Sequence, residues 1–159
     1  MLGERLAAAG LADRFVCPFL SPVPFEAMAS AEAALADAEG PTVVVGSSLG
    51  GYYATWLAEK HDLRAVLINP AVMAPVLLSS LVGTHTNVHT GVSFEFTFEH
   101  VEQLRALSAA TVSSARYLLL VETGDEVLDY RQAVERYAGS RQVVLEGGDH
   151  SFTRFPELV

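Results

Sequence analysis

A serine-bearing turn follows an apolar run in the first third of the chain. The run Val43-Val44-Val45 leads into Gly46-Ser47-Ser48-Leu49-Gly50-Gly51, after which the residues favour helix. This pattern is typical of a strand, a tight turn and a helix with a hydroxyl at the apex. A nucleophile on such a turn needs small residues two positions before and after it, because those positions collide across the bend. Ser48 has Gly46 and Gly50 there, whereas Ser47 has larger residues, so we expect Ser48 to be the nucleophile.

An acid and a base follow the serine, each just after another predicted strand. Asp125 comes after the apolar run that ends at Val121, and His150 follows a glycine pair behind the last run. Parallel α/β sheets place their sites beyond the carboxyl ends of strands, and the chain order serine, aspartate, histidine is that of α/β-hydrolases. A serine hydroxyl needs a histidine to take its proton, and a buried carboxylate holds that imidazole in the right tautomer. The sequence therefore predicts a triad of Ser48, Asp125 and His150.

Other acids in the same loops compete with Asp125. Glu126 is adjacent and could substitute, but we expect its side chain to point elsewhere from the loop. Asp129 is placed to cap the helix that follows, and Asp149 neighbours His150 in the chain, where adjacent side chains diverge. Each triad member also has an ordinary interpretation as a turn or surface residue. Their common position after strands, in the hydrolase order, favours catalysis.

The remaining residues with possible chemistry give weaker signals. His85 and His89 lie four residues apart in a segment rich in turn residues with no completing ligand nearby, so we expect exposed loop histidines and no metal site. His61 ends a predicted helix, where a cation favours the helix dipole. The glycines at 46–51 do not match a phosphate-binding loop, since no lysine follows them and the G-x-G-x-x-G spacing is absent.

The elements that must position the triad alternate between strand and helix. Apolar runs bounded by glycine, proline and turn residues predict strands at residues 14–17, 42–45, 64–68, 93–98, 117–121 and 142–145. Helical spacing or propensity predicts helices at residues 2–12, 25–38, 51–61, 100–107 and 129–137. The run at 42–45 is continuously apolar, which is typical of a strand covered on both faces. Residues 83–91 show no period. The alternation predicts an α/β fold with a parallel sheet.

Composition bounds the class of protein. A length of 159 residues argues for a single domain over residues 1–159, and half of the residues are hydrophobic, which is enough for a core. A formal charge of −9 without a basic cluster argues against nucleic-acid and anionic-membrane partners. The longest apolar stretch is too short and too interrupted to span a bilayer, and the N-terminus lacks a signal-peptide pattern. We therefore expect a cytoplasmic protein, with the single cysteine, Cys17, buried in a strand.

Four segments together resemble the YqiA-like esterase family, small bacterial α/β-hydrolases of the UPF0227 type. They are residues 46–57, 69–72, 123–131 and 147–152. The resemblance covers nearly the whole chain and implies an α/β-hydrolase-like parallel sheet flanked by helices. It implies hydrolysis of a small-molecule ester or thioester through an acyl-enzyme, without a cofactor. Ser48, Asp125 and His150 match the family's triad positions, and the backbone N–H of Leu49 would contribute to the oxyanion hole.

The chain departs from the family pattern at its ends. Family members usually begin with a strand and a loop of the His-Gly-Phe type that supplies the second oxyanion donor, and they usually end in a closing helix. We expect the sheet to lack that first strand and the fold to lack that helix. Losing one oxyanion donor typically costs about 10²–10³-fold in kcat. The alternative function is therefore a truncated, weakly active or inactive hydrolase-fold protein that acts as a binding module.

Two further departures concern the substrate. Met73 stands where the family often has an arginine, which removes a possible anchor for an anionic group. Residues 84–91 differ from the corresponding family segment, which resembles part of a cap over the site. We therefore expect a cap-like insertion at about residues 71–99 and a substrate choice of its own. The oligomeric state is not readable, although an exposed sheet edge would favour self-association.

Overall fold

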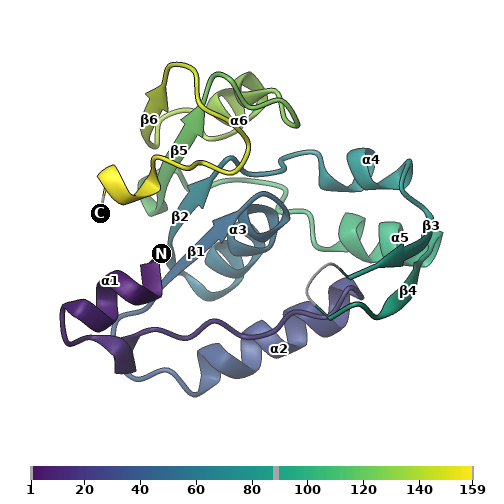
Figure 1. Ribbon diagram of the computed structural model, residues 1–159, viewed down its shortest axis with the longest axis horizontal. Coiled ribbons are helices and arrows are strands. Elements are labelled where there is room, and N and C mark those ends of the chain that lie inside the picture. Colours follow the sequence, from purple (N-terminus) through teal and green to yellow (C-terminus); the bar gives the residue numbers. More distant parts are fainter. Residues whose placement is uncertain (1, 88–89, 159) are drawn as a thin grey trace.

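A computed structural model describes residues 2–87 and 90–158 (Figure 1). Within these residues, four strands form a parallel sheet in the order β1-β2-β5-β6. They are β1 (Val43–Ser47), β2 (Arg64–Ile68), β5 (Tyr117–Glu122) and β6 (Arg141–Leu145). A separate antiparallel hairpin is formed by β3 (Gly83–Thr86) and β4 (Ser93–Phe96). The predicted parallel α/β sheet is therefore confirmed.

Helices connect the strands of the sheet. The α-helices are α1 (Leu2–Ala8), α2 (Pro24–Ala36), α3 (Leu49–His61), α4 (Ala74–Ser79), α5 (Phe98–Ala106) and α6 (Tyr130–Arg136). Short 3-10 helices are η1 (Ala12–Arg14), η2 (Ser114–Arg116) and η3 (Phe155–Glu157). Helices α4 and α5 and the β3–β4 hairpin form a group at one side of the molecule, away from the sheet (Figure 1). No helix in the described part of the chain is long and apolar enough to cross a membrane.

Each face of the sheet has its own apolar cluster. On one face, small residues of α3 and α6 pack against β2 and β5, and Leu67, Leu119 and Val121 are completely buried there. On the other face, Phe152 and Phe155 pack against residues of β2, β5 and β6, together with the start of α1. A third cluster joins α2, α3, α4 and α5 at the side of the sheet. The sheet is thus fixed between two layers, with its carboxyl edge left for loops.

Most predicted elements are confirmed, because long apolar runs and clear turn residues bound them. The strand predicted at residues 64–68 matches β2, and the strands predicted at 117–121 and 142–145 differ from β5 and β6 by one residue. The helices predicted at 25–38, 51–61, 100–107 and 129–137 match α2, α3, α5 and α6 within two residues. Asp129 caps α6 as predicted, since its carboxylate accepts a hydrogen bond from the N–H of Arg131 at 3.0 Å.

One strand predicted near the N-terminus is absent, and another is present but less buried than predicted. Residues 14–17 form the end of η1 and an irregular segment without a partner strand, and Cys17 is exposed rather than buried. Strand β1 exists, but Val43 is 53% exposed and Val45 is 43% exposed, so it is not covered on both faces. The cluster around Phe152 reaches β2, β5 and β6 and leaves out β1, which lies at the sheet edge.

The middle segment also differs from prediction. Residues 83–86 showed no period, yet they form β3, because β4 supplies their hydrogen-bond partners from Gly83 opposite Phe96 to Thr86 opposite Ser93. The strand predicted at 93–98 ends at Phe96, and Phe98 opens α5 with its side chain 70% exposed. Phe94 and Phe96 pack against the cluster of α2, α3, α4 and α5, whereas Phe98 does not. That residues 71–99 act as a cap stays a prediction.

Candidate active site

Ser48 lies in the turn between β1 and α3 with φ 53° and ψ −122°. This backbone conformation is uncommon for a residue other than glycine, so the surrounding contacts must hold it. The N–H of Ser48 donates to the carbonyl of Ile68 at 3.0 Å, and the carbonyl of Ser48 accepts from the N–H of Ala71 at 3.0 Å. The turn is thus fixed to the end of β2, with its hydroxyl at the carboxyl edge of the sheet.

The two glycines around Ser48 play different parts. A Cβ added at Gly46 would lie 2.1 Å from the carbonyl oxygen of Gly50, so only glycine fits there. A Cβ added at Gly50 would meet no heavy atom within 4 Å. The expectation that both positions must be small is therefore right at Gly46 and wrong at Gly50. At Gly50 it is the backbone that lies close to Gly46, and a side chain at position 50 would not contact Gly46.

The structure brings the three predicted triad residues together. The Nε2 atom of His150 lies 3.0 Å from Oγ of Ser48. Its Nδ1 atom lies 2.9 Å from Oδ2 and 3.0 Å from Oδ1 of Asp125. Because a carboxylate only accepts hydrogen bonds, this geometry assigns the ring proton to Nδ1 and leaves Nε2 free to accept from the serine hydroxyl. The arrangement can remove a proton from Ser48 and hold the resulting imidazolium against a carboxylate.

The side chain of Asp125 is 1% exposed and is held by its own loop. Its Oδ1 atom accepts hydrogen bonds from the N–H groups of Val127 at 2.9 Å and Leu128 at 2.8 Å. These two donors fix the carboxylate in the orientation that faces His150. The carboxylate of Glu126 bonds to the backbone of the histidine, since its Oε2 atom accepts from the N–H of His150 at 3.0 Å.

A buried carboxylate that the sequence reasoning missed supports the histidine loop. Glu122, at the end of β5, is 0% exposed. Its two oxygens accept hydrogen bonds from Nε of Arg154 at 2.6 Å and from the N–H of Asp149 at 2.8 Å. Gly148, with φ 77°, lies so close that an added Cβ would be 2.1 Å from this carboxyl group. The sequence could have indicated Glu122, because a glutamate directly after an apolar run is unusual, whereas no local pattern marks Arg154.

Leu49 is the first residue of α3. The N–H groups of the first helical turn have no acceptor within the helix, and the helix dipole makes this end positive. A negative charge that develops beside Ser48 would therefore find a backbone donor at Leu49.

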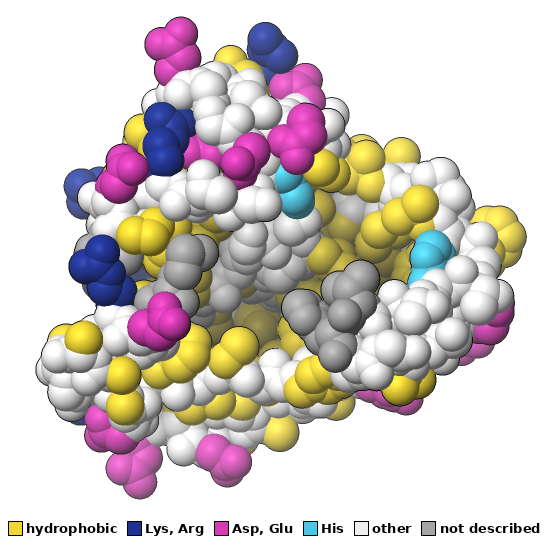
Figure 2. Space-filling view, in the orientation of Figure 1, with side chains coloured by type: hydrophobic (Ala, Val, Ile, Leu, Met, Phe, Trp, Pro, Cys, Tyr) yellow, Lys and Arg dark blue, Asp and Glu magenta, His cyan; other side chains and the backbone are white. Residues whose placement is uncertain are grey.

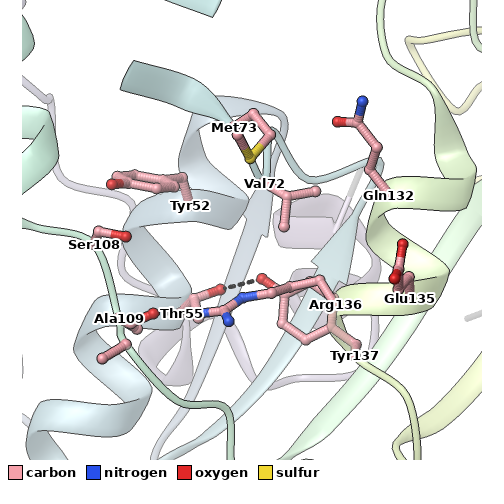
Figure 3. A pocket seen from close by; sticks show the side chains of 11 residues that line it. Tyr52, Thr55, Val72, Met73, Ser108, Ala109, Gln132, Glu135, Arg136 and Tyr137 are labelled. Atoms are coloured by element: carbon pink, nitrogen blue, oxygen red, sulfur yellow. Dashed lines mark hydrogen bonds between the residues drawn. The ribbon is translucent and has the colours of Figure 1, made fainter. Parts of the chain in front are cut away.

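A groove lies between α3, α6 and the loop after α5 (Figure 3). Its volume is about 660 Å³, and none of the triad residues is among its lining residues. Tyr52 and Met73 line one side of it, and the hydroxyls of Thr55 and Tyr137 form a 2.7 Å hydrogen bond at its wall. Burial raises the pKa of the Tyr137 phenol. Figure 2 shows that the face toward the viewer is hollowed near its middle, with hydrophobic side chains in the hollow.

His61 and His85 have ordinary contacts outside the triad. His61 lies in the last turn of α3 and pairs with Glu32 at 2.7 Å. His85 belongs to β3, where its ring contacts Phe94 and a ring nitrogen bonds to the carbonyl of Leu81. The predicted loop position of His89 falls outside the described residues. Within residues 2–87 and 90–158, no group of three or more His, Cys, Asp or Glu is placed to hold a metal ion.

Comparisons with known proteins agree with this architecture. A family model described as "Uncharacterised protein family (UPF0227)" matches residues 2–159. A suspected hydrolase from Agrobacterium vitis S4 is similar in structure, with a TM-score of 0.66 and 21% identity over 86% of this chain and 64% of that one. The mouse alpha/beta hydrolase domain-containing protein 10 gives a TM-score of 0.61 and 18% identity over 86% of this chain and 65% of that one.

A third similar structure is an esterase domain of a Rhodothermus marinus protein. It gives a TM-score of 0.59 and 19% identity over 84% of this chain and 62% of that one. The chain therefore spans between 62% and 65% of the length of these three proteins. At this level of identity, the likeness shows a common α/β-hydrolase fold.

Proposed function

We propose that this chain, which belongs to the UPF0227 family, is a carboxylic-ester hydrolase that forms an acyl-enzyme on Ser48. The observation that carries the proposal is the chain of contacts from Oγ of Ser48 to His150 at 3.0 Å and on to Asp125 at 2.9 Å. The esterase domain among the similar structures supports the same class of reaction. Serine, histidine and aspartate in this geometry are the groups that acyl transfer requires.

In the first half of the reaction, Oγ of Ser48 attacks the carbonyl carbon of the ester while Nε2 of His150 takes the hydroxyl proton. The former carbonyl oxygen becomes negatively charged and accepts a hydrogen bond from the N–H of Leu49. When the tetrahedral intermediate collapses, His150 gives its proton to the leaving alcohol, or to the thiol of a thioester. Asp125 stabilises the imidazolium throughout, because its buried carboxylate faces Nδ1 at 2.9 Å.

In the second half, a water molecule replaces the alcohol. His150 takes a proton from this water as it attacks the acyl carbon, and then returns a proton to Oγ of Ser48 as the acid leaves. The substrate is a small-molecule ester or thioester, and residues 71–99 act as a cap that shapes its binding. None of these steps requires a cofactor.

Hydrolysis of p-nitrophenyl acetate and butyrate tests this proposal. Ser48→Ala should remove activity above the level of the uncatalysed reaction, and the matched Ser47→Ala, one residue earlier in β1, should retain it. A fluorophosphonate probe should label the wild-type protein once, at Ser48. Equal hydrolysis by the wild type and Ser48→Ala, together with no labelling, would contradict the esterase proposal and favour the binding-module alternative.

A further inference from the structure

Asn69, the residue directly after β2, combines three unusual features. It is 2% exposed, its φ is 39°, and its side chain contacts both the end of β5 and the loop that carries His150. A left-handed backbone conformation is uncommon outside glycine, although asparagine tolerates it better than most residues. Such a conformation persists only where the surroundings fix it, and it is concentrated at functional sites.

The amide group of Asn69 is fully engaged on both sides. Its Nδ2 atom donates to the carbonyl oxygens of Asp149 at 3.1 Å and His150 at 3.2 Å. Its Oδ1 atom accepts from the N–H of Glu122 at 3.0 Å. The backbone N–H of Asn69 continues the parallel ladder by donating to the carbonyl of Leu120 at 2.9 Å. One side chain therefore joins the end of β5 to the loop that carries the histidine.

These contacts fix the distance on which the proposed triad depends. Asp125 lies three residues beyond Glu122, in the loop that begins at the end of β5. His150 lies in the other loop, and its own carbonyl is one of the two acceptors of Asn69. A shift of the histidine loop relative to β5 would lengthen the 2.9 Å contact between Nδ1 of His150 and Oδ2 of Asp125. Asn69, placed at the end of the central strand β2, prevents such a shift.

We propose that Asn69 is a positioning residue of the active site, which holds the imidazole of His150 in register with Asp125 without contacting the substrate. This inference rests on the proposed esterase function. The side chain is specific for the task, because it presents two N–H donors and one acceptor within one short planar group. Aspartate has the same shape but no donors, and glutamine would carry the amide one methylene too far.

The competing interpretation is that Asn69 only satisfies buried polar groups and so stabilises the fold. Gln142 in β6 offers a matched control for that role. Its Nε2 atom also donates to two backbone carbonyls, those of Val134 at 3.1 Å and Tyr137 at 2.8 Å. These carbonyls belong to the C-terminal end of α6 and not to either triad loop.

The test compares Asn69→Asp and Asn69→Gly with Gln142→Glu. The aspartate variant keeps the size and the acceptor but turns an oxygen toward two carbonyls, and the glycine variant removes the amide while accepting the positive φ. We expect kcat for p-nitrophenyl butyrate to fall about 10²-fold in both Asn69 variants, as for a catalytic group displaced by about 1 Å, with KM changed by less than about twofold. Gln142→Glu should keep the wild-type kcat, whatever it costs in stability.

A spectroscopic readout makes the test independent of turnover. The proton on Nδ1 of His150, held against a carboxylate, should give a far-downfield NMR resonance that Asp125→Asn removes. This resonance should be lost from both Asn69 variants and kept in Gln142→Glu, at a temperature where circular dichroism shows all of them folded. If Asn69→Asp does not fold, Asn69→Gly carries the comparison, because its backbone is relieved of strain.

The outcomes separate the two proposals. A wild-type protein that is neither labelled by fluorophosphonate nor active would refute the esterase function, while the resonance would still report on positioning. Folded Asn69 variants with the wild-type kcat and an unchanged resonance would overturn the role of Asn69. An equal loss of kcat in Gln142→Glu would also overturn the role of Asn69, because the loss would then follow from reduced stability alone.

Discussion

Replacing Gly46 by alanine should damage both the fold and the nucleophile turn. The new Cβ would lie 2.1 Å from the carbonyl oxygen of Gly50, 2.4 Å from its carbonyl carbon and 2.7 Å from the nitrogen of Gly51. Nonbonded contacts of carbon are favourable at about 3.5–4.0 Å, so β1 and α3 must separate by more than about 1 Å. All three opposing atoms belong to the backbone, which means that no side-chain rotation can relieve the overlap.

The expected size of the effect follows from this geometry. Overpacking of a rigid site typically costs about 1–3 kcal/mol of stability, and a backbone clash lies at the upper end of that range. A displacement of about 1 Å between nucleophile and base can cost about 10²-fold in rate. Since Ser48 is flanked by β1 and α3, their separation moves Oγ away from Nε2 of His150, which now lies at 3.0 Å.

Gly50→Ala is the matched control, because it adds the same methyl group two residues after the serine. An added Cβ there meets nothing within 4 Å, and the position lies in the first turn of α3. Alanine in a helix is favoured over glycine by about 0.5–1 kcal/mol, so this variant should be slightly more stable than wild type.

Urea unfolding and the rate of fluorophosphonate labelling measure the two effects of the glycine substitutions. The reasoning is refuted if Gly46→Ala matches the wild type in both assays, or if Gly50→Ala is damaged as severely as Gly46→Ala.

Three further predictions concern polar groups that hold the fold. Although burial opposes the shift, hydrogen bonds from Ser113 and Tyr117 lower the pKa of Glu59. The ionised carboxylate therefore stabilises the fold above its unfolded pKa of about 4.3, and this stability is lost as the pH falls through the folded pKa. Glu59→Gln should therefore unfold in less urea at pH 7 and show a shallower loss of stability below about pH 5. Burial raises the pKa of the Tyr117 phenol, so above about pH 10 the folded state keeps a proton that the unfolded state releases. Urea unfolding from pH 8 to 11 should therefore show wild-type stability falling above about pH 10, and falling less steeply in Tyr117→Phe. Thr55→Val removes the 2.7 Å hydrogen bond to the buried Tyr137 hydroxyl and should cost about 1–3 kcal/mol, whereas adding Tyr137→Phe should restore part of that loss in a double-mutant cycle of unfolding free energies.

The parts of the fold that the sequence predicted well are those set by local patterns. Strand β2 follows from an apolar run that stops at Asn69-Pro70, and α3 follows from the glycine-rich turn before it. The meeting of Ser48, Asp125 and His150 could be predicted because parallel strands bring their carboxyl ends to one edge of a sheet. The ladder shows this directly, since Ser47 lies opposite Ile68 and Ile68 opposite Leu120.

The parts that could not be predicted depend on partners far away in the chain. Residues 14–17 contain a short apolar run of the kind found in strands, but no neighbouring strand pairs with them. Residues 83–86 lack any period, but β4 pairs with them and makes them a strand. The exposure of Val43 and Val45 depends on which helices reach the edge strand, and no apolar run can report that.

The histidine loop shows why the supporting residues of the site were also missed. The amide of Asn69, directly after β2, holds the carbonyls of Asp149 and His150 in this loop. Further along the chain, Arg154 bonds to the buried Glu122 at the end of β5. Gly148, directly before Asp149, leaves room for the Glu122 carboxyl group. These groups are polar, buried and distant in sequence, so only the parallel alignment of β2 and β5 brings them together. Because the loop that carries the proposed base is held mainly by polar contacts of defined direction, losing one of these contacts should alter the geometry of His150 as well as the stability of the fold.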